Sequence, residues 1–247
     1  VALGCLTLAL IAVLMMALQP SYWWALRLFH LHLNTLGFVG LAALGTLPVL
    51  LPTTLSLPDP QAAGWLRRRL WLVAGGALLV AVGASVSWPF AAPGAALLLV
   101  AALGLLGQWL RRFGLATTLG DGAAASLVSA VAGLLMTLVA GVGHGAGLFS
   151  PEPTLAAWGV AFLLPLVTGA LSHLLPVWRW PGHVSPIRTS ARQRLTATGR
   201  VRAVLFFLGG LAILGGEGRV VAGLAITAML LFGIAILQAI RLSRSTR

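Results

Sequence analysis

The sequence predicts an all-α, polytopic membrane protein, and two observations carry this prediction. Hydrophobic residues make up 59% of the 247 positions and charged residues only 8%, and the mean hydropathy is +1.00. The hydrophobic residues also form long, nearly continuous runs of helical length. A water-soluble domain of this size cannot cover its surface with so few polar side chains, so the lipid bilayer is the expected solvent.

Eight apolar segments have the length of a membrane span, because a transmembrane helix needs about 20 mostly apolar residues. Breaks rich in proline, glycine or acidic residues separate them, as at Pro58-Asp59-Pro60 and at Gly120-Asp121. We therefore predict eight transmembrane helices in one domain, 1–247. The predicted helices cover residues 1–19, 26–51, 66–87, 90–110, 122–147, 154–178, 199–216 and 219–241.

The basic residues predict the orientation of these helices. All sixteen are arginines, and fourteen lie in or next to the breaks after the second, fourth and sixth segments and the C-terminal tail, with only Arg27 and Arg219 on the other side. The positive-inside rule then predicts that both ends of the given chain are cytoplasmic, which requires an even number of spans. The same distribution explains the net charge of +12 without nucleic acid. We expect the arginine-rich loop 179–202 to lie on anionic lipid, with a docking surface for a partner as the alternative.

An internal repeat relates the second and sixth segments. Residues 36–52 align with residues 160–176, with Phe38 opposite Phe162 and the pattern GxLxxLLP in both. This predicts two parallel four-helix repeat units, 1–115 and 120–247. Thr154 and Ala156 take the positions of His30 and His32 in the second unit, so a histidine site is expected in the first unit alone.

The fifth segment carries a predicted packing face. Side chains of small residues recur every four positions along it, which lets a neighbouring backbone approach closely. We expect this face to seat another helix; a groove for a flat macrocycle is the alternative. Asp121 is expected to cap this helix, and Pro48 and Pro165 are expected to kink the second and sixth. The small residues are Ser129, Gly133, Thr137, Gly141 and Gly145.

The second segment carries the candidate site, because it holds His30, His32 and Asn34. Polar groups able to bind a metal are costly in hydrocarbon and are functional by default. Two residues along a helix are about 200° apart, so the two histidines face opposite sides and cannot share one metal without distortion.

Three further residues lie at a similar expected depth: Met15 and Met16 near the end of the first segment and His144 near the end of the fifth. Imidazole and thioether suit haem iron or Cu(I). The candidate ligands are therefore His30, His32 and His144 for a cofactor, with Met15 and Met16 added for a metal. The alternative is that His144 is an interfacial residue and that the methionines fill gaps.

Two other histidines are weaker candidates. His173, near the predicted cytoplasmic end of the sixth segment, is either a proton-relay member or a buried histidine bonded to a carbonyl. His183 lies in the arginine-rich loop and is expected to be solvated. No acidic residue lies inside any predicted span, so the sequence lacks the carboxylate chain that proton and cation pumps use.

The histidine-containing segment resembles a known helix. His30-Leu31-His32, followed by Leu36-Gly37-Phe38-Val39-Gly40, Gly45 and Leu51-Pro52, is similar to the tenth helix of the catalytic subunit of haem-copper oxygen reductases, especially the C-type oxidases. It resembles, more loosely, the histidine-containing helix of the NnrS family of haem and copper membrane proteins. The resemblance implies haem b, with or without copper, with His30 facing a high-spin haem and His32 a low-spin haem. The chain has no His-His pair and its one tyrosine, Tyr22, lies outside the segment, so oxygen reduction by this chain alone is not expected.

Three functions remain open on the sequence. The first is a redox or metal protein of the bacterial inner membrane that works with other membrane subunits or with a periplasmic redox partner. The second is a structural or assembly subunit of a larger membrane enzyme complex, without a cofactor of its own. The third is a small-molecule permease, which the lack of acidic residues in the spans makes the weakest of the three.

Overall fold

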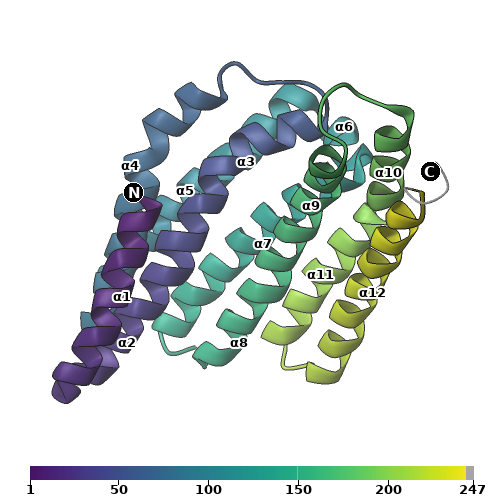
Figure 1. The fold of residues 1–247 in the computed structure, drawn as a ribbon. Helices are drawn as coiled ribbons and strands as arrows, with labels where there is room; N and C mark the ends of the chain where they lie inside the picture. The colour runs from purple at the N-terminus through teal and green to yellow at the C-terminus, as the bar shows by residue number, and fades with distance from the viewer. Residues whose placement is uncertain (149, 243–247) are drawn as a thin grey trace. The chain divides into compact units, whose positions relative to one another are not determined.

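The computed structural model describes residues 1–148 and 150–242, which form helices joined by short turns, without a strand in these ranges (Figure 1). Seven helical segments within them are long and apolar enough to cross a membrane. α1 is also apolar but has only 17 residues. The prediction of an all-helical, multi-pass membrane protein is confirmed.

The helices follow one another with few interruptions, and each predicted span coincides with one helix or with three helical elements in continuous succession. Three of the elements are not α-helical: η1 is a 3₁₀ turn, and η2 and η3 are π-helical. The elements are α1 (Ala2–Leu18), η1 (Pro20–Tyr22), α2 (Trp23–His32), η2 (Leu33–Gly40), α3 (Leu41–Thr54), α4 (Ala62–Val86), α5 (Trp88–Phe113), α6 (Leu115–Gly120), α7 (Gly122–Gly145), α8 (Pro151–Ala157), η3 (Trp158–Leu163), α9 (Leu164–Arg179), α10 (Pro186–Ala197), α11 (Gly199–Leu214) and α12 (Gly218–Leu242).

The chain divides into two compact units. Unit 1 comprises Val1–Val49, Asp59–Leu105 and Leu138–Ser150, and unit 2 comprises Leu50–Pro58, Leu106–Thr137 and Pro151–Arg247. These bounds differ from those of the predicted repeat units 1–115 and 120–247, because the end of α3 belongs to unit 2 and the end of α7 to unit 1. The repeat itself stays a prediction.

Unit 1 is held together by close approach of small residues. α2 packs against both α1 and α4. A Cβ added to Gly37 would lie 2.9 Å from Leu33 Cδ1 and 3.0 Å from Cys5 Cβ, so α1 is seated directly on η2. A Cβ on Gly94 would lie 2.6 Å from the carbonyl oxygen of Gly76, so α4 and α5 are in backbone contact as well. Dispersion and close packing replace the hydrophobic effect as the force between helices in lipid.

Unit 2 confirms the predicted packing face of the fifth span at two of its positions. Ser129 Oγ donates a hydrogen bond of 2.9 Å to the carbonyl of Ala203 in α11. A Cβ on Gly133 would clash with the carbonyl oxygen of Ala161 in η3. Helices of the protein therefore occupy this part of the face. Further along, a Cβ on Gly141 would meet nothing within 4 Å, so the close contact does not extend along the whole predicted stripe.

Both helices that the sequence alignment pairs contain a π-helical segment at matching positions. η2 covers Leu33–Gly40, which the alignment places opposite residues 157–164, and η3 covers Trp158–Leu163. In η2 the hydroxyl of Thr35 donates to the carbonyl of Leu31 at 2.8 Å and so competes with the backbone for that acceptor. At η3, Pro165 has no N–H for the carbonyl of Ala161, and its ring crowds that carbonyl. α3 continues unbroken through Pro48.

The prediction of a loop over 179–202 is wrong for residues 186–197, which form α10. Ser185 caps this helix by accepting a hydrogen bond of 3.3 Å from the N–H of Arg188, and Pro186 occupies the first turn. Ala191 and Leu195, four residues apart, are buried against Phe232 and its neighbours on α12. The helix was not predicted because this narrow apolar stripe stands among mostly polar residues.

Candidate histidine site

His30 is half-buried on α2 and is fixed to α1. Its Nδ1 lies 2.9 Å from the carbonyl oxygen of Ala9. Because a carbonyl only accepts, Nδ1 carries the hydrogen and Nε2 keeps its lone pair. This bond ties α2 to α1 and turns His30 toward the α1 side.

His32 lies on the other side of the same helix, as the rotation of about 200° predicts. Its Nδ1 donates a hydrogen bond of 2.9 Å to the carbonyl of Leu28, one turn earlier. The lone pair of Nε2 is again left for another partner. His144, at the end of α7, interacts electrostatically with His32, and both imidazoles are half-buried in unit 1. His32 and His144 are therefore within electrostatic range of each other in the same unit.

The hydrogen bond of His32 has the form found at metal sites. A ligating histidine almost always donates its second ring N–H to a carbonyl or carboxylate, which fixes the tautomer and the ring orientation. Within the described residues, no three His, Cys, Asp or Glu side chains gather into a group that could hold a metal ion. A pair of imidazoles suits axial ligation of haem iron or binding of Cu(I) rather than the closed four-ligand shell of structural zinc.

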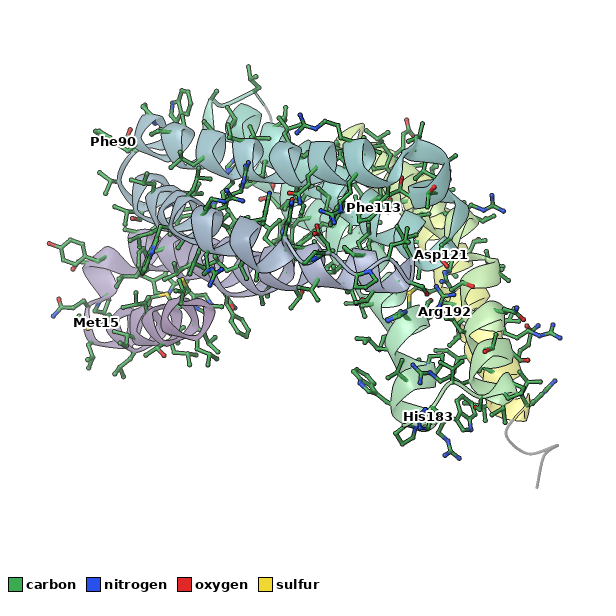
Figure 2. All side chains as sticks on the ribbon, turned by 90° about the horizontal axis from the view of Figure 1, so that it is seen from above. Met15, Phe90, Phe113, Asp121, His183 and Arg192 are labelled. Carbon is green, nitrogen blue, oxygen red and sulfur yellow. The ribbon has the colours of Figure 1, made fainter. Side chains whose placement is uncertain are left out.

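The predicted methionine ligands lie in different surroundings. Met15 is 37% exposed on α1 (Figure 2). Met16 is half-buried on α1. Because part of the Met15 side chain is uncovered by the protein, His32 and His144 are the preferred donors.

The remaining histidines take different roles. His173 Nδ1 is buried on α9 without a hydrogen-bond partner in the described protein, so the carbonyl bond that the sequence interpretation favoured is not made by this nitrogen. His183 is exposed in the turn before α10, as expected (Figure 2).

Asp121 caps α7, as the sequence predicts, and it also forms an ion pair with Arg192. Its Oδ1 accepts hydrogen bonds from the backbone N–H groups of Ala123 at 2.9 Å and Ala124 at 3.0 Å. Its Oδ2 accepts one of 2.7 Å from Arg192 Nη2, and Figure 2 shows the two side chains side by side. Arg192 Nη2 also donates to the carbonyl of Thr54. One arginine thus joins the end of α3, the start of α7 and α10 within unit 2.

One polar group was missed by the sequence reasoning. Arg202 in the first turns of α11 is fully buried, whereas the charge pattern assigned it to the arginine-rich loop 179–202, on anionic lipid. Its Nη2 donates to Ser172 Oγ at 2.9 Å and to the carbonyl of Leu195 at 3.1 Å. A signal was present, because Arg202 falls inside the predicted span 199–216, and an intramembrane charge is a functional candidate by default.

Comparison with known proteins adds no relative. No protein family, no curated protein and no solved structure matches the chain. The residues and their geometry therefore carry the functional argument.

Proposed function

We propose that this chain is a membrane redox or metal-handling protein that binds haem b or copper through His32 and His144. The single observation that carries the proposal is the bond of His32 Nδ1 to the carbonyl of Leu28 at 2.9 Å, with His144 of the same unit within electrostatic range of His32. That bond presents Nε2 as the metal-binding atom. Haem iron or copper held there would give the protein one-electron chemistry.

His30 has a related but separate part in the proposal. Its Nδ1 bond to Ala9 also leaves Nε2 as a possible ligand atom, on the opposite side of α2. The resemblance to the haem-copper oxygen reductases would assign it a second cofactor. We propose that the main role of His30 is to position α1. Ligation of a second cofactor by His30 is the alternative, and the absorption experiment described below distinguishes the two roles.

The proposal includes the topology. With α1 as an eighth span, both ends would lie on one side, and the positive-inside rule applied to the arginines supports the cytoplasm of a bacterium as that side. Arg244 and Arg247, two of the arginines in this argument, lie outside the described residues. His32 and His144 would then lie toward the outer face of the inner membrane. A periplasmic redox protein or a further membrane subunit is the partner this arrangement suits.

A reduced-minus-oxidised absorption spectrum of the purified full chain, with metal analysis, tests the proposal. We expect a haem α-band or bound copper that His32→Ala and His144→Ala each remove. His183→Ala is the matched control, because it removes an exposed imidazole, and it should retain the full signal. His30→Ala should keep the His32-dependent signal; loss of a second, separate band would assign a cofactor to His30.

Two results would contradict the proposal. A colourless, metal-free protein purified from cells supplied with haem and copper would favour the structural or assembly subunit. A spectrum that survives both His32→Ala and His144→Ala would move the cofactor to another site. Uptake of a solute by proteoliposomes that persists without either histidine would favour the permease.

A further inference from the structure

The guanidinium of Arg202 is buried in unit 2 with most of its hydrogen-bonding capacity unused. A guanidinium carries five N–H donors and is always charged in proteins. Two of them, on Nη2, are used on Ser172 Oγ and the carbonyl of Leu195. Nη1 and Nε, with the other three, are buried and find no partner within the described protein. An arginine in this position costs several kcal/mol unless the charge and the donors are compensated.

The protein supplies only a weak counterpart to this charge. The Arg202 guanidinium carbon lies 4.7 Å from the centre of the Phe232 ring, a cation–π contact that offsets about 2 kcal/mol at best. No carboxylate pairs with Arg202 in the part of the chain that the structure describes. The stretch 186–214, which contains α10 and α11, has five arginines and no acidic residue.

The start of α11 increases the local excess of positive potential. Arg202 lies in the first turns of a 16-residue helix, where the helix dipole already favours an anion and disfavours a cation. Thr198, at the N-cap, makes no side-chain capping bond, and its hydroxyl is buried without a partner. Thr198 precedes Arg202 by one helical turn, so both side chains belong to the same side of α11.

We propose that Arg202 and Thr198 bind a phosphate oxyanion at the start of α11. A tetrahedral group with several acceptor oxygens matches the unused N–H donors of Nη1 and Nε, the hydroxyl of Thr198 and the positive end of the helix. The phosphate belongs either to free inorganic phosphate or to the head group of an anionic phospholipid. This site lies in unit 2 and does not depend on the histidine pair of unit 1.

Thermal unfolding of the delipidated full chain in a neutral detergent tests the proposal. A ligand that binds only the folded state raises the midpoint of unfolding with its concentration. We expect inorganic phosphate, or mixed micelles containing phosphatidylglycerol, to raise the midpoint relative to chloride at equal ionic strength. Arg202→Met should abolish that response, and Thr198→Val should weaken the apparent affinity about tenfold, because one hydrogen bond to a charged group is lost.

Arg200→Gln is the matched control, because it removes the same charge from an exposed position on the same helix; it should retain the response. Arg202→Lys keeps the charge but offers fewer donors, and it provides a folded variant if Arg202→Met does not accumulate. A response to phosphate identifies the free anion, and a response only to phosphatidylglycerol identifies the lipid. The proposal is overturned if neither ligand shifts the wild-type midpoint, or if Arg202→Lys and Thr198→Val respond as the wild type does.

Discussion

Arg192 and Asp121, 71 positions apart in the chain, are joined by a 2.7 Å hydrogen-bonded ion pair. Asp121 also accepts two backbone hydrogen bonds at the start of α7, and Arg192 also donates to the carbonyl of Thr54. A local cap and a long-range contact therefore share one carboxylate. Because the side chains are 32% and 20% exposed, the ion pair is expected to contribute less than the cap.

Substitution of Asp121 separates the two contributions. Asp121→Asn retains a good N-cap side chain and should lower the free energy of unfolding by about 1 kcal/mol or less. Asp121→Ala loses both functions and should lower it by about 2 kcal/mol. Thermal unfolding in detergent, followed by circular dichroism, measures the difference. Arg194→Gln, at an exposed position of α10, is the charge control, and equal effects of the two Asp121 variants would exclude a capping contribution.

Two glycines of α7 are expected to respond oppositely to the same substitution. Gly133→Ala places a methyl group against the carbonyl oxygen of Ala161 and must separate α7 from η3, whereas Gly141→Ala meets nothing within 4 Å. We expect Gly133→Ala to reduce the yield of folded protein and the unfolding midpoint. Gly141→Ala should be neutral or slightly stabilising, because alanine favours the helix. Size-exclusion profiles and thermal unfolding compare them, and equal behaviour would contradict the packing described for Gly133.

The bond between His30 and the carbonyl of Ala9 is expected to hold α1 against α2. His30→Ala removes the donor and should cost about 1 kcal/mol, whereas His30→Asn can restore part of the bond through its amide. Limited proteolysis in detergent measures how readily α1 detaches. Faster cleavage of α1 in His30→Ala than in His30→Asn is the expected order. If all three proteins are cleaved at the same rate, the bond does not hold α1 in place.

The π-helical segment η2 is expected to set the direction in which His32 points. Deletion of Val39 should return this turn to α-helical spacing and change the rise and rotation that relate His32 to α3. The metal-dependent absorption assigned to His32 and His144 should then be lost. Deletion of Leu163 makes the equivalent change in η3, in a helix whose one histidine, His173, is not a candidate ligand, and should leave the absorption intact. Loss of the signal in both variants would indicate general misfolding instead of a register effect.

Much of the fold could be predicted because its signals are local. Runs of apolar residues located the helices: the predicted span 122–147, for example, corresponds to the observed helix Gly122–Gly145. The aspartate before that run, Asp121, correctly predicted the N-cap of the helix. The count of eight spans is not confirmed, because seven helical segments of the described residues are long enough to cross a membrane and α1, the eighth, has only 17 residues. α10 was missed because only two buried residues define its apolar stripe, against a background of arginine and threonine.

The candidate site could be predicted only in part, because local sequence signals do not show how segments far apart in the chain pack together. Helix rotation alone placed His30 and His32 on opposite sides, and the expected depth selected His144. Which helix each imidazole faces depends on packing between segments far apart in sequence. The buried Arg202 shows the same limit, since its burial depends on Ser172 and Phe232 from other helices, and the charge pattern favours a solvated position for any arginine near a helix end.

The π segments also affect how long backbone amide hydrogens stay protected. A π turn is wider than the α-helix on either side and is rarely stable beyond a single turn, so it should open locally before its flanks. Hydrogen–deuterium exchange should therefore show a patch of early exchange at Leu33–Gly40 and a second at Trp158–Leu163, each between slowly exchanging turns. Uniform protection through α2 and α3 would contradict this. The residue that precedes the first patch is His32, so the turn that opens most readily lies next to a candidate ligand.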